Sequence, residues 1–386
     1  MPRRQHKKSR NGCLECKRRH IKCDERRPVC AQCTTSERIC EFSERHARIV
    51  LSAASSRQTP SSTTGTPLSE PAVAAGSHEE PPVNMLHAEL LCHLVTETLG
   101  SLSRDNSHLA SLFSTEIMKC CSEAPYLLNE LLALAATHIS IIRPAQQALY
   151  RHHAAQLQNH ALRFFHATNP TPTSTPTACM PRFLFSSILG MHTLCDTLVF
   201  RDDDFNVFLD RFIHYLHIHR GVRAVIGSNW RVLAESTALA PTLGDAESRL
   251  QADNAPLGPE CSRLLALTQS SNLSPSIAAT YQHAIEALQL AMNSASSLEP
   301  MGSCPPGIFS WPATLSPEYV DLLALRSPDA LAVLAHYGVV LHAHRHHWFL
   351  GDGGRYLIES IREYLGPDWA EWLAFPNHAL SQSTIP

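Results

Sequence analysis

Six cysteines near the N-terminus constrain this chain more than any other feature of its sequence. They are Cys13, Cys16, Cys23, Cys30, Cys33 and Cys40, spaced C-x2-C-x6-C-x6-C-x2-C-x6-C, so that the unit C-x2-C-x6-C occurs twice. A zinc ion takes four thiolates in a tetrahedron. One zinc would leave two cysteines unused, whereas two zincs need eight bonds, so two cysteines must bridge both metals. Cys13 and Cys30 each open one unit, and the repeat therefore predicts two Zn²⁺ ions bridged by this pair.

The charge of the chain is divided unequally along its length. Residues 1–50, called the head below, carry 14 Lys and Arg against 6 Asp and Glu, a net charge of +8. The other 336 residues carry 18 against 29, a net charge of −11. A basic segment beside a metal cluster favours a polyanionic partner. We expect a basic arm to act as a nuclear import signal, a phosphate contact, or both; it consists of Arg3, Arg4, Lys7, Lys8 and Arg10.

The N-terminus lacks the apolar stretch of a signal peptide, and we expect no membrane span, because no uninterrupted apolar run reaches roughly eighteen residues. A reducing compartment follows as the expectation, in which scattered cysteines are small buried side chains rather than a disulfide framework.

The segment RNGCLECKRRHIKCDERRPVCAQC, continued to the sixth cysteine, resembles the fungal binuclear zinc cluster, Zn(II)2Cys6, family of transcription factors. The resemblance covers all six cysteines, the basic run between the second and third, Asp24 and Pro28. It implies bridging by the first and fourth cysteines, in agreement with the count of bonds. It also implies a sequence-specific regulator of RNA polymerase II transcription in the nucleus, which binds double-stranded DNA with CGG-type triplets and acts on the transcription machinery.

The run between the second and third cysteines supplies the candidate DNA-binding residues. They are Lys17, Arg18, Arg19, His20 and Lys22, and we expect a short helix here that faces the major groove. An arginine can bond guanine O6 and N7 in bidentate fashion. The resemblance implies that Arg19 and His20 touch the triplet and that the two lysines lie near phosphates. Many relatives carry Lys at the position of His20, and a neutral histidine offers one donor rather than three, which leaves the partner of His20 open.

A coiled coil is not predicted after the cluster, because residues 41–58 sustain no heptad pattern. Residues 51–84 are predicted to be a disordered linker rich in Ser, Thr and Pro. Either the protein binds DNA as a monomer, or its dimer contacts lie in residues 85–380, called the body below.

The body is predicted to be one all-α regulatory domain. Apolar residues repeat at three and four positions from Leu127 to Ala135, in a helix ending near Ile142. The same period occurs from Phe205 to Leu216, from Tyr281 to Met292 and from Leu331 to Leu341. A proline-rich break is expected near residues 170–177 and a loop near 299–313.

Several apolar segments of the body resemble the regulatory domain of the sterol uptake control protein group, among them YLLNELLALAATHIS and FLDRFIHYLHIHRGVRAV. That resemblance implies a helical domain whose apolar pocket binds a sterol and so governs transcription. The wider family also contains regulators of secondary-metabolite gene clusters. We therefore favour regulation of a biosynthetic gene cluster, with a sterol or a pathway metabolite as effector, and keep sterol-responsive control as the alternative.

Three polar groups in the body have structural interpretations. We expect His342, His344, His346 and His347 to form a polar helix end rather than a metal site, and Gly351, Gly353 and Gly354 to form a helix-entry turn. Asp202, Asp203 and Asp204 are expected to cap the helix that follows them. No combination of nucleophile, base and oxyanion donors is recognisable, so the chain is not predicted to be an enzyme. A ligand-binding protein with a structural zinc staple, and an enzyme with an appended DNA-binding head, stay open as rivals.

Overall fold

The structure is a computed structural model of the 386-residue chain. It describes residues 13–19, 21–26, 30–36, 40, 83–102, 115, 117–168, 176–226, 233, 257–271, 273–296 and 307–382. Two compact units are present, residues 1–79 and 80–386. The basic arm (Arg3, Arg4, Lys7, Lys8 and Arg10), His20 and the segment expected to lack a coiled coil lie outside the described residues. So does the expected linker apart from its last two residues, and its extent stays a prediction.

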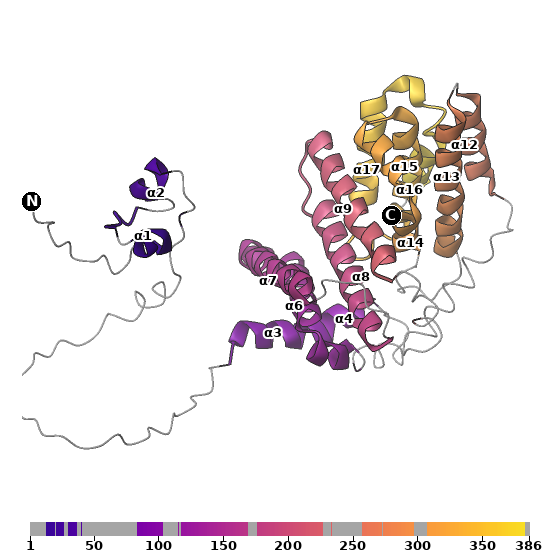
Figure 1. Ribbon diagram of the computed structural model, residues 1–386. Helices are drawn as coiled ribbons and strands as arrows, with labels where there is room; N and C mark the ends of the chain where they lie inside the picture. The colour runs from indigo at the N-terminus through magenta and orange to yellow at the C-terminus, as the bar shows by residue number, and fades with distance from the viewer. Residues whose placement is uncertain are drawn as a thin grey trace, which may run out of the picture. The chain divides into compact units, whose positions relative to one another are not determined.

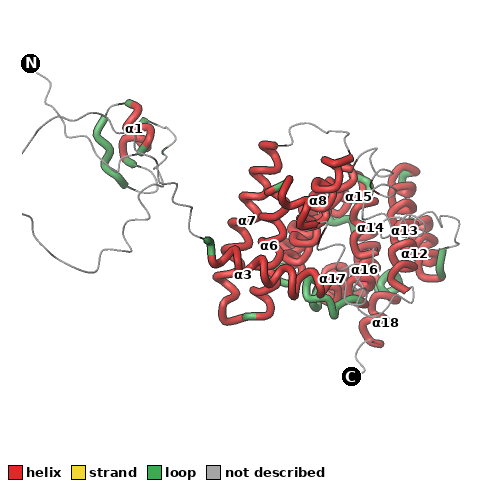
Figure 2. Tube along the Cα trace, turned by 90° about the horizontal axis from the view of Figure 1, so that it is seen from below, coloured by secondary structure: helices red, strands yellow, loops and turns green. Residues whose placement is uncertain are grey.

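The first unit contains two helices of five residues each, α1 (Leu14–Arg18) and α2 (Ala31–Thr35) (Figure 1). The second unit contains helices throughout its described part. They are α3 (Met85–His93), η2 (Leu94–Thr98), α4 (Leu99–Leu102), α6 (Pro125–Ile142), η3 (Pro144–Gln146), α7 (Gln147–Thr168), α8 (Pro176–Leu198), α9 (Phe205–Ile226), α12 (Pro259–Ser270), α13 (Pro275–Ser296), α14 (Gly307–Thr314), α15 (Pro317–Ala324), α16 (Pro328–Ala343), α17 (Gly353–Leu365), η5 (Pro367–Trp369) and α18 (Ala374–Gln382). The described residues contain no strand, which confirms the predicted all-α body (Figure 2).

The long helices α8 and α9 pack against each other and connect two groups of helices in the body (Figure 1). On one side α6 packs against α7, α3 and α8. On the other side α9 contacts α14 and α15, while α16 packs against α13 and α17. Each segment that was predicted to be helical from its apolar period lies within one helix, namely α6, α9, α13 or α16.

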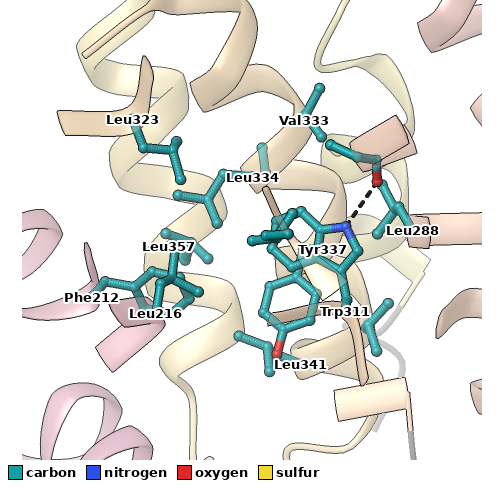
Figure 3. Packing of buried hydrophobic residues seen from close by; sticks show 14 of the residues in the cluster. Phe212, Leu216, Leu288, Trp311, Leu323, Val333, Leu334, Tyr337, Leu341 and Leu357 are labelled. Carbon is teal, nitrogen blue, oxygen red and sulfur yellow. Dashed lines mark hydrogen bonds between the residues drawn. The ribbon is translucent and has the colours of Figure 1, made fainter. Parts of the chain in front are cut away.

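The largest core surrounds α16, in which Val333, Leu334 and Leu341 are fully buried (Figure 3). Trp311 of α14 stacks on Tyr337 of α16 with ring centroids 4.4 Å apart, and its Nε1 donates to the carbonyl of Ala284 at 2.9 Å. The loop expected near residues 299–313 is therefore wrong from Gly307 onward. Burying the indole stabilises a helix there, although Pro312 lies within it.

Helix α6 is the centre of the other core, and 13 of its 18 residues are buried. By length and composition it is apolar enough to cross a membrane, but 72% of it is buried inside the body. It also carries a buried polar network. Glu130 Oε1 lies 2.9 Å from Nδ1 of His192 on α8, and the other ring nitrogen of that histidine lies 2.7 Å from Oγ1 of Thr137. Although burial disfavours a charged imidazole, the Glu130 carboxylate raises the pKa of His192 overall.

The polar groups singled out in the body have mixed outcomes. Asp204 caps α9, since its Oδ1 accepts from the backbone N–H groups of Asn206 and Val207 at 2.8 and 3.1 Å. The predicted glycine turn is right for Gly351, which precedes α17 with φ +51°, but wrong for Gly353 and Gly354, which are the first two residues of that helix. The polar helix end is wrong for two of its four histidines. His342 and His347 are 2% and 4% exposed, and α17 packs closely against the backbone of α16 at His342.

Candidate metal centre and nucleic-acid interface

The two five-residue helices of the head begin in the same way. Cys13 precedes α1 and Cys30 precedes α2, both with extended backbone. The helical turn that follows each of them brings the cysteine three positions later beside it. The backbone N–H of Cys16 accordingly donates to the Sγ of Cys13 at 3.4 Å. This is the structural reason that a C-x2-C pair directs two thiols toward one point.

The six sulfurs form two groups of four. One group is Cys13, Cys16, Cys23 and Cys30, and the other is Cys13, Cys30, Cys33 and Cys40; within each group the sulfurs lie within 4.8 Å of one another. Four sulfurs placed about 2.3 Å from a central zinc are separated by about 3.8 Å in a regular tetrahedron. The Sγ separations are 3.7 Å for Cys13–Cys30, Cys13–Cys33 and Cys16–Cys30. The sulfurs therefore fit two tetrahedral zinc ions.

The two groups share Cys13 and Cys30, which are therefore the common edge of the two tetrahedra. This confirms the pair expected from the count of bonds. Cys13, Cys16, Cys23, Cys30 and Cys33 are buried, and Cys40 is half-buried. With all six deprotonated, two Zn²⁺ ions leave a formal charge of about −2 on the cluster.

Backbone N–H groups and the two zinc ions both stabilise these thiolates. The N–H of Cys13 donates to Sγ of Cys23 at 3.5 Å, and the N–H of Cys30 donates to Sγ of Cys40 at 3.3 Å. Burial, together with the neighbouring sulfurs, raises the pKa of Cys33 to about 12. Without cations the Cys33 thiol would keep its proton at neutral pH, so metal binding and formation of this centre are coupled.

A local two-fold relation links the halves of the head. The N–H···S bonds just described join residues ten positions apart in both halves, and α1 and α2 have equal length. A shift of 17 positions carries each of the first three cysteines onto one of the last three. The same shift carries Arg19 onto Ser36, and Arg19 Nη1 donates to Ser36 Oγ at 3.0 Å.

The basic residues are arranged differently from the expectation. The helix covers Leu14–Arg18, whereas a helix was expected between Cys16 and Cys23. Its early start has a physical reason: Cys13 caps the helix, and the chain must leave it to return Cys23 to the metal. Arg19 is consequently the C-cap residue, and Lys22 lies in the non-helical segment 21–26.

The basic residues differ from the metal ligands in being exposed to solvent. This holds for all four described ones, Lys17, Arg18, Arg19 and Lys22. Their partners do differ. Arg18 forms an ion pair with Glu15 of the same helix at 2.7 Å.

Two residues of the head have contacts that the spacing of cysteines does not reveal. Oδ1 of Asp24 accepts from the backbone N–H of Ala31 at 3.0 Å and so joins the two halves. Its negative charge at the start of α2 follows the usual preference at a helix N-terminus, which is a signal present in the sequence. Ser36 was not singled out, because its partner is 17 positions away and only the metal-centred fold brings them together.

Among the described residues, the groups of His, Cys, Asp or Glu close enough to hold a metal ion are these cysteine groups. Comparison with known proteins gives the same location, since residues 11–49 match the family described as "Fungal Zn(2)-Cys(6) binuclear cluster domain". The head is such a domain. It binds two zinc ions through the six cysteines.

Similarity to curated proteins extends beyond the cluster. The chain is 25% identical over its whole length to a "Zn(2)-C6 fungal-type transcription factor" of Gibberella zeae, of which it covers 88%. It is 30% identical to the factor afumD of Aspergillus fumigatus over 38% of this chain and 37% of that protein. It is 55% identical to "Sterol uptake control protein 2" of Candida albicans over 40 residues, 10% of this chain and 6% of that protein. No solved structure matches the chain.

Proposed function

We propose that the head binds a CGG-type triplet in double-stranded DNA and that Arg19 contacts a guanine. The observation that carries this proposal is the exposed Arg19 at the end of α1, next to a rigid metal centre. A guanidinium can pair with O6 and N7 of guanine at once, and such bidentate contacts are the commonest specific contacts of arginine with DNA.

The neighbouring basic residues have other roles in this proposal. Arg18 is partly neutralised by Glu15 and contributes less than Arg19. Lys17 and Lys22 are exposed ammonium groups and contact phosphates, which position the protein but carry no sequence information. His20 is proposed to contact the triplet beside Arg19.

Two single variants of the full chain test these roles. Arg19→Ala is expected to cost about 1–3 kcal/mol on a CGG-containing duplex and much less on a scrambled duplex. Lys22→Ala is expected to weaken both duplexes about equally and to lower the salt slope by roughly one unit. Titrations at several salt concentrations measure both effects, and zinc content controls for folding because neither residue is a metal ligand.

An equal loss on both duplexes for Arg19→Ala would show that Arg19 does not contact a base. In that case His20→Ala becomes the next variant to measure, because the base contact would lie at His20 or another neighbour.

We propose a nuclear location, with the basic arm as import signal. A fluorescent fusion in which Arg3, Arg4, Lys7, Lys8 and Arg10 are replaced by alanine is expected to lose nuclear accumulation. If nuclear accumulation persists while affinity for DNA falls, the basic arm contacts DNA but is not the import signal.

We propose that the body regulates transcription of a biosynthetic gene cluster, in contact with the transcription machinery and with an apolar effector. Sterol-responsive control ranks second, because the matches to sterol uptake control proteins cover only 40 and 46 residues. Since its relatives are transcription factors, the chain is proposed to be a regulator rather than an enzyme.

Thermal unfolding of the full chain with cluster metabolites and with sterols discriminates the two effectors. A bound effector stabilises the folded chain by RT ln(1 + L/Kd), where L is its free concentration, so it raises the melting temperature once that concentration exceeds Kd. A higher melting temperature with sterols alone would favour sterol-responsive control over control of a biosynthetic gene cluster. No change with either class of compound would favour a protein partner as the effector.

A further inference from the structure

Arg19 and Ser36 are equivalent residues in the two halves of the head. Arg19 is the C-cap of α1 and Ser36 is the C-cap of α2, six positions after Cys13 and Cys30 respectively. The bond from Arg19 Nη1 to Ser36 Oγ is 3.0 Å long. The local two-fold relation that pairs the bridging cysteines therefore also pairs a cationic residue of one half with a hydroxyl of the other.

The hydroxyl of Ser36 is oriented to accept this bond. It donates its single proton to the carbonyl oxygen of Gln32, one turn earlier in α2, at 2.6 Å. A serine hydroxyl has one donor and two acceptor lone pairs, so with its proton engaged only the lone pairs face Arg19. Because α2 begins at the bridging residue Cys30, the metal centre fixes the position of this acceptor.

The guanidinium keeps the donors that a guanine contact needs. Arginine has five N–H donors in a planar fork, and the bond to Ser36 uses one of them, on Nη1. The edge formed by Nε and Nη2 can still meet guanine O6 and N7. A side chain already held in one orientation loses less conformational freedom when it binds, which increases affinity for the ligand that fits that orientation.

We propose that Ser36 is a positioning residue for Arg19 and that it sets the specificity of the head for its guanine. The inference rests on the proposed function, in which Arg19 contacts a base. It assigns a part in DNA recognition to the second half of the head, although α2 itself carries no Lys or Arg.

The variant Ser36→Ala in the full chain tests the proposal, and Thr35→Ala is its matched control. Thr35 is the preceding residue, and its hydroxyl likewise donates to a carbonyl one turn earlier, that of Ala31 at 2.9 Å. Ser36→Ala is expected to lower affinity for the CGG duplex by about three- to tenfold, the size of one exposed charge-assisted hydrogen bond. Affinity for the scrambled duplex, the salt slope and the content of two zincs are expected to stay unchanged.

Two further variants separate positioning from a direct DNA contact. Ser36→Thr keeps a hydroxyl and is expected to restore specificity. In the Arg19→Ala background, Ser36→Ala is expected to have no additional effect, because the group that it orients is gone. An additional loss in that background would overturn the proposal by showing that Ser36 acts without Arg19.

The result for Arg19→Ala distinguishes failure of this inference from failure of the proposed function. If Arg19→Ala reduces the ratio of specific to scrambled affinity while Ser36→Ala leaves it intact, Ser36 has no positioning role and the base contact of Arg19 stands. If Arg19→Ala lowers both affinities equally, the base contact and the role of Ser36 both fail.

Discussion

The Sγ atoms of Cys13 and Cys30 lie 3.7 Å apart and belong to both four-sulfur groups of the head. Each of the other four cysteines belongs to one group only. A bridging sulfur is therefore shared by two zinc ions, while a terminal sulfur serves one. The two kinds of cysteine are expected to respond differently to substitution.

Cys13→Ser is expected to retain less zinc than Cys23→Ser, because it removes a ligand from both metals rather than from one. Elemental analysis of the full chain after dialysis measures zinc, and the unmodified protein should hold two ions in the head. Cys92→Ser, at an exposed position on α3, is the control and should lose none. Chelation should unfold the head, which has little apolar core besides its cysteines. Full zinc retention by Cys13→Ser would contradict the bridge.

The buried pair of Glu130 and His192 supports a prediction about the body. His192→Gln would leave the carboxylate of Glu130 buried without its cationic partner, at a cost of about 3–5 kcal/mol in the free energy of unfolding. The double variant Glu130→Gln with His192→Gln removes both charges and should recover much of that loss. Urea unfolding followed by helical circular dichroism measures the cycle. Simple additivity of the two single effects would show that the pair is not coupled.

Three buried histidines predict that the body loses stability in mild acid. Burial lowers the pKa of His138, His219 and His336 to about 4, below the ordinary value of about 6.5. As pH falls between these two values, the unfolded chain binds protons that the folded body does not. The free energy of unfolding should therefore fall by about 1.4 kcal/mol per pH unit for each histidine.

The pKa of His192 is raised, so its contribution has the opposite sign: it is present at low pH and is lost as pH rises through the folded value. Urea midpoints at pH 7, 6 and 5 measure the balance. His336→Gln should reduce the acid slope, because it removes one of the three histidines with a lowered pKa. An unchanged slope in His336→Gln would contradict the neutral state assigned to this histidine.

Much of the metal centre could be predicted because its information is local. The spacing of the cysteines and the valence of zinc select Cys13 and Cys30 without any knowledge of the fold. The partner of Arg19 could not be predicted in this way. Ser36 becomes its neighbour only when both halves bind the same pair of metals, and the identity of a serine carries no signal of that contact.

The body shows the same division between local and distant information. Prolines at the start of α6, α12, α15 and α16 are helix signals, because the first turn needs no N–H donor from them. The prolines around α14 favoured a loop. The packing of Trp311 on Tyr337, which belongs to a later helix, stabilises a helix there instead. His342 and His347 looked polar by composition but are buried, and at His342 the later helix α17 packs closely against α16.

Gly354 lies where α17 packs closely against the backbone of α16, and it yields the sharpest prediction for the body. A Cβ built on Gly354 would lie 2.7 Å from the carbonyl oxygen of Gly338 and 2.8 Å from Cα of His342. Both atoms belong to the backbone of α16, so no side-chain rotation relieves the clash. Gly354→Ala must separate the two helices and is expected to lower the free energy of unfolding by about 1–3 kcal/mol or more.

Gly221→Ala, in α9, is the matched control, since a Cβ there meets nothing within 4 Å. Alanine in a helix interior is favoured over glycine by roughly 0.5–1 kcal/mol, so this variant should be slightly more stable than the unmodified chain. Urea unfolding of both variants measures the contrast with the same substitution at two helical positions. If Gly354→Ala is as stable as Gly221→Ala, the close contact between α16 and α17 does not exist in solution. If Gly354→Ala alone is destabilised, the glycine once expected only to form a helix-entry turn is needed for packing between these helices.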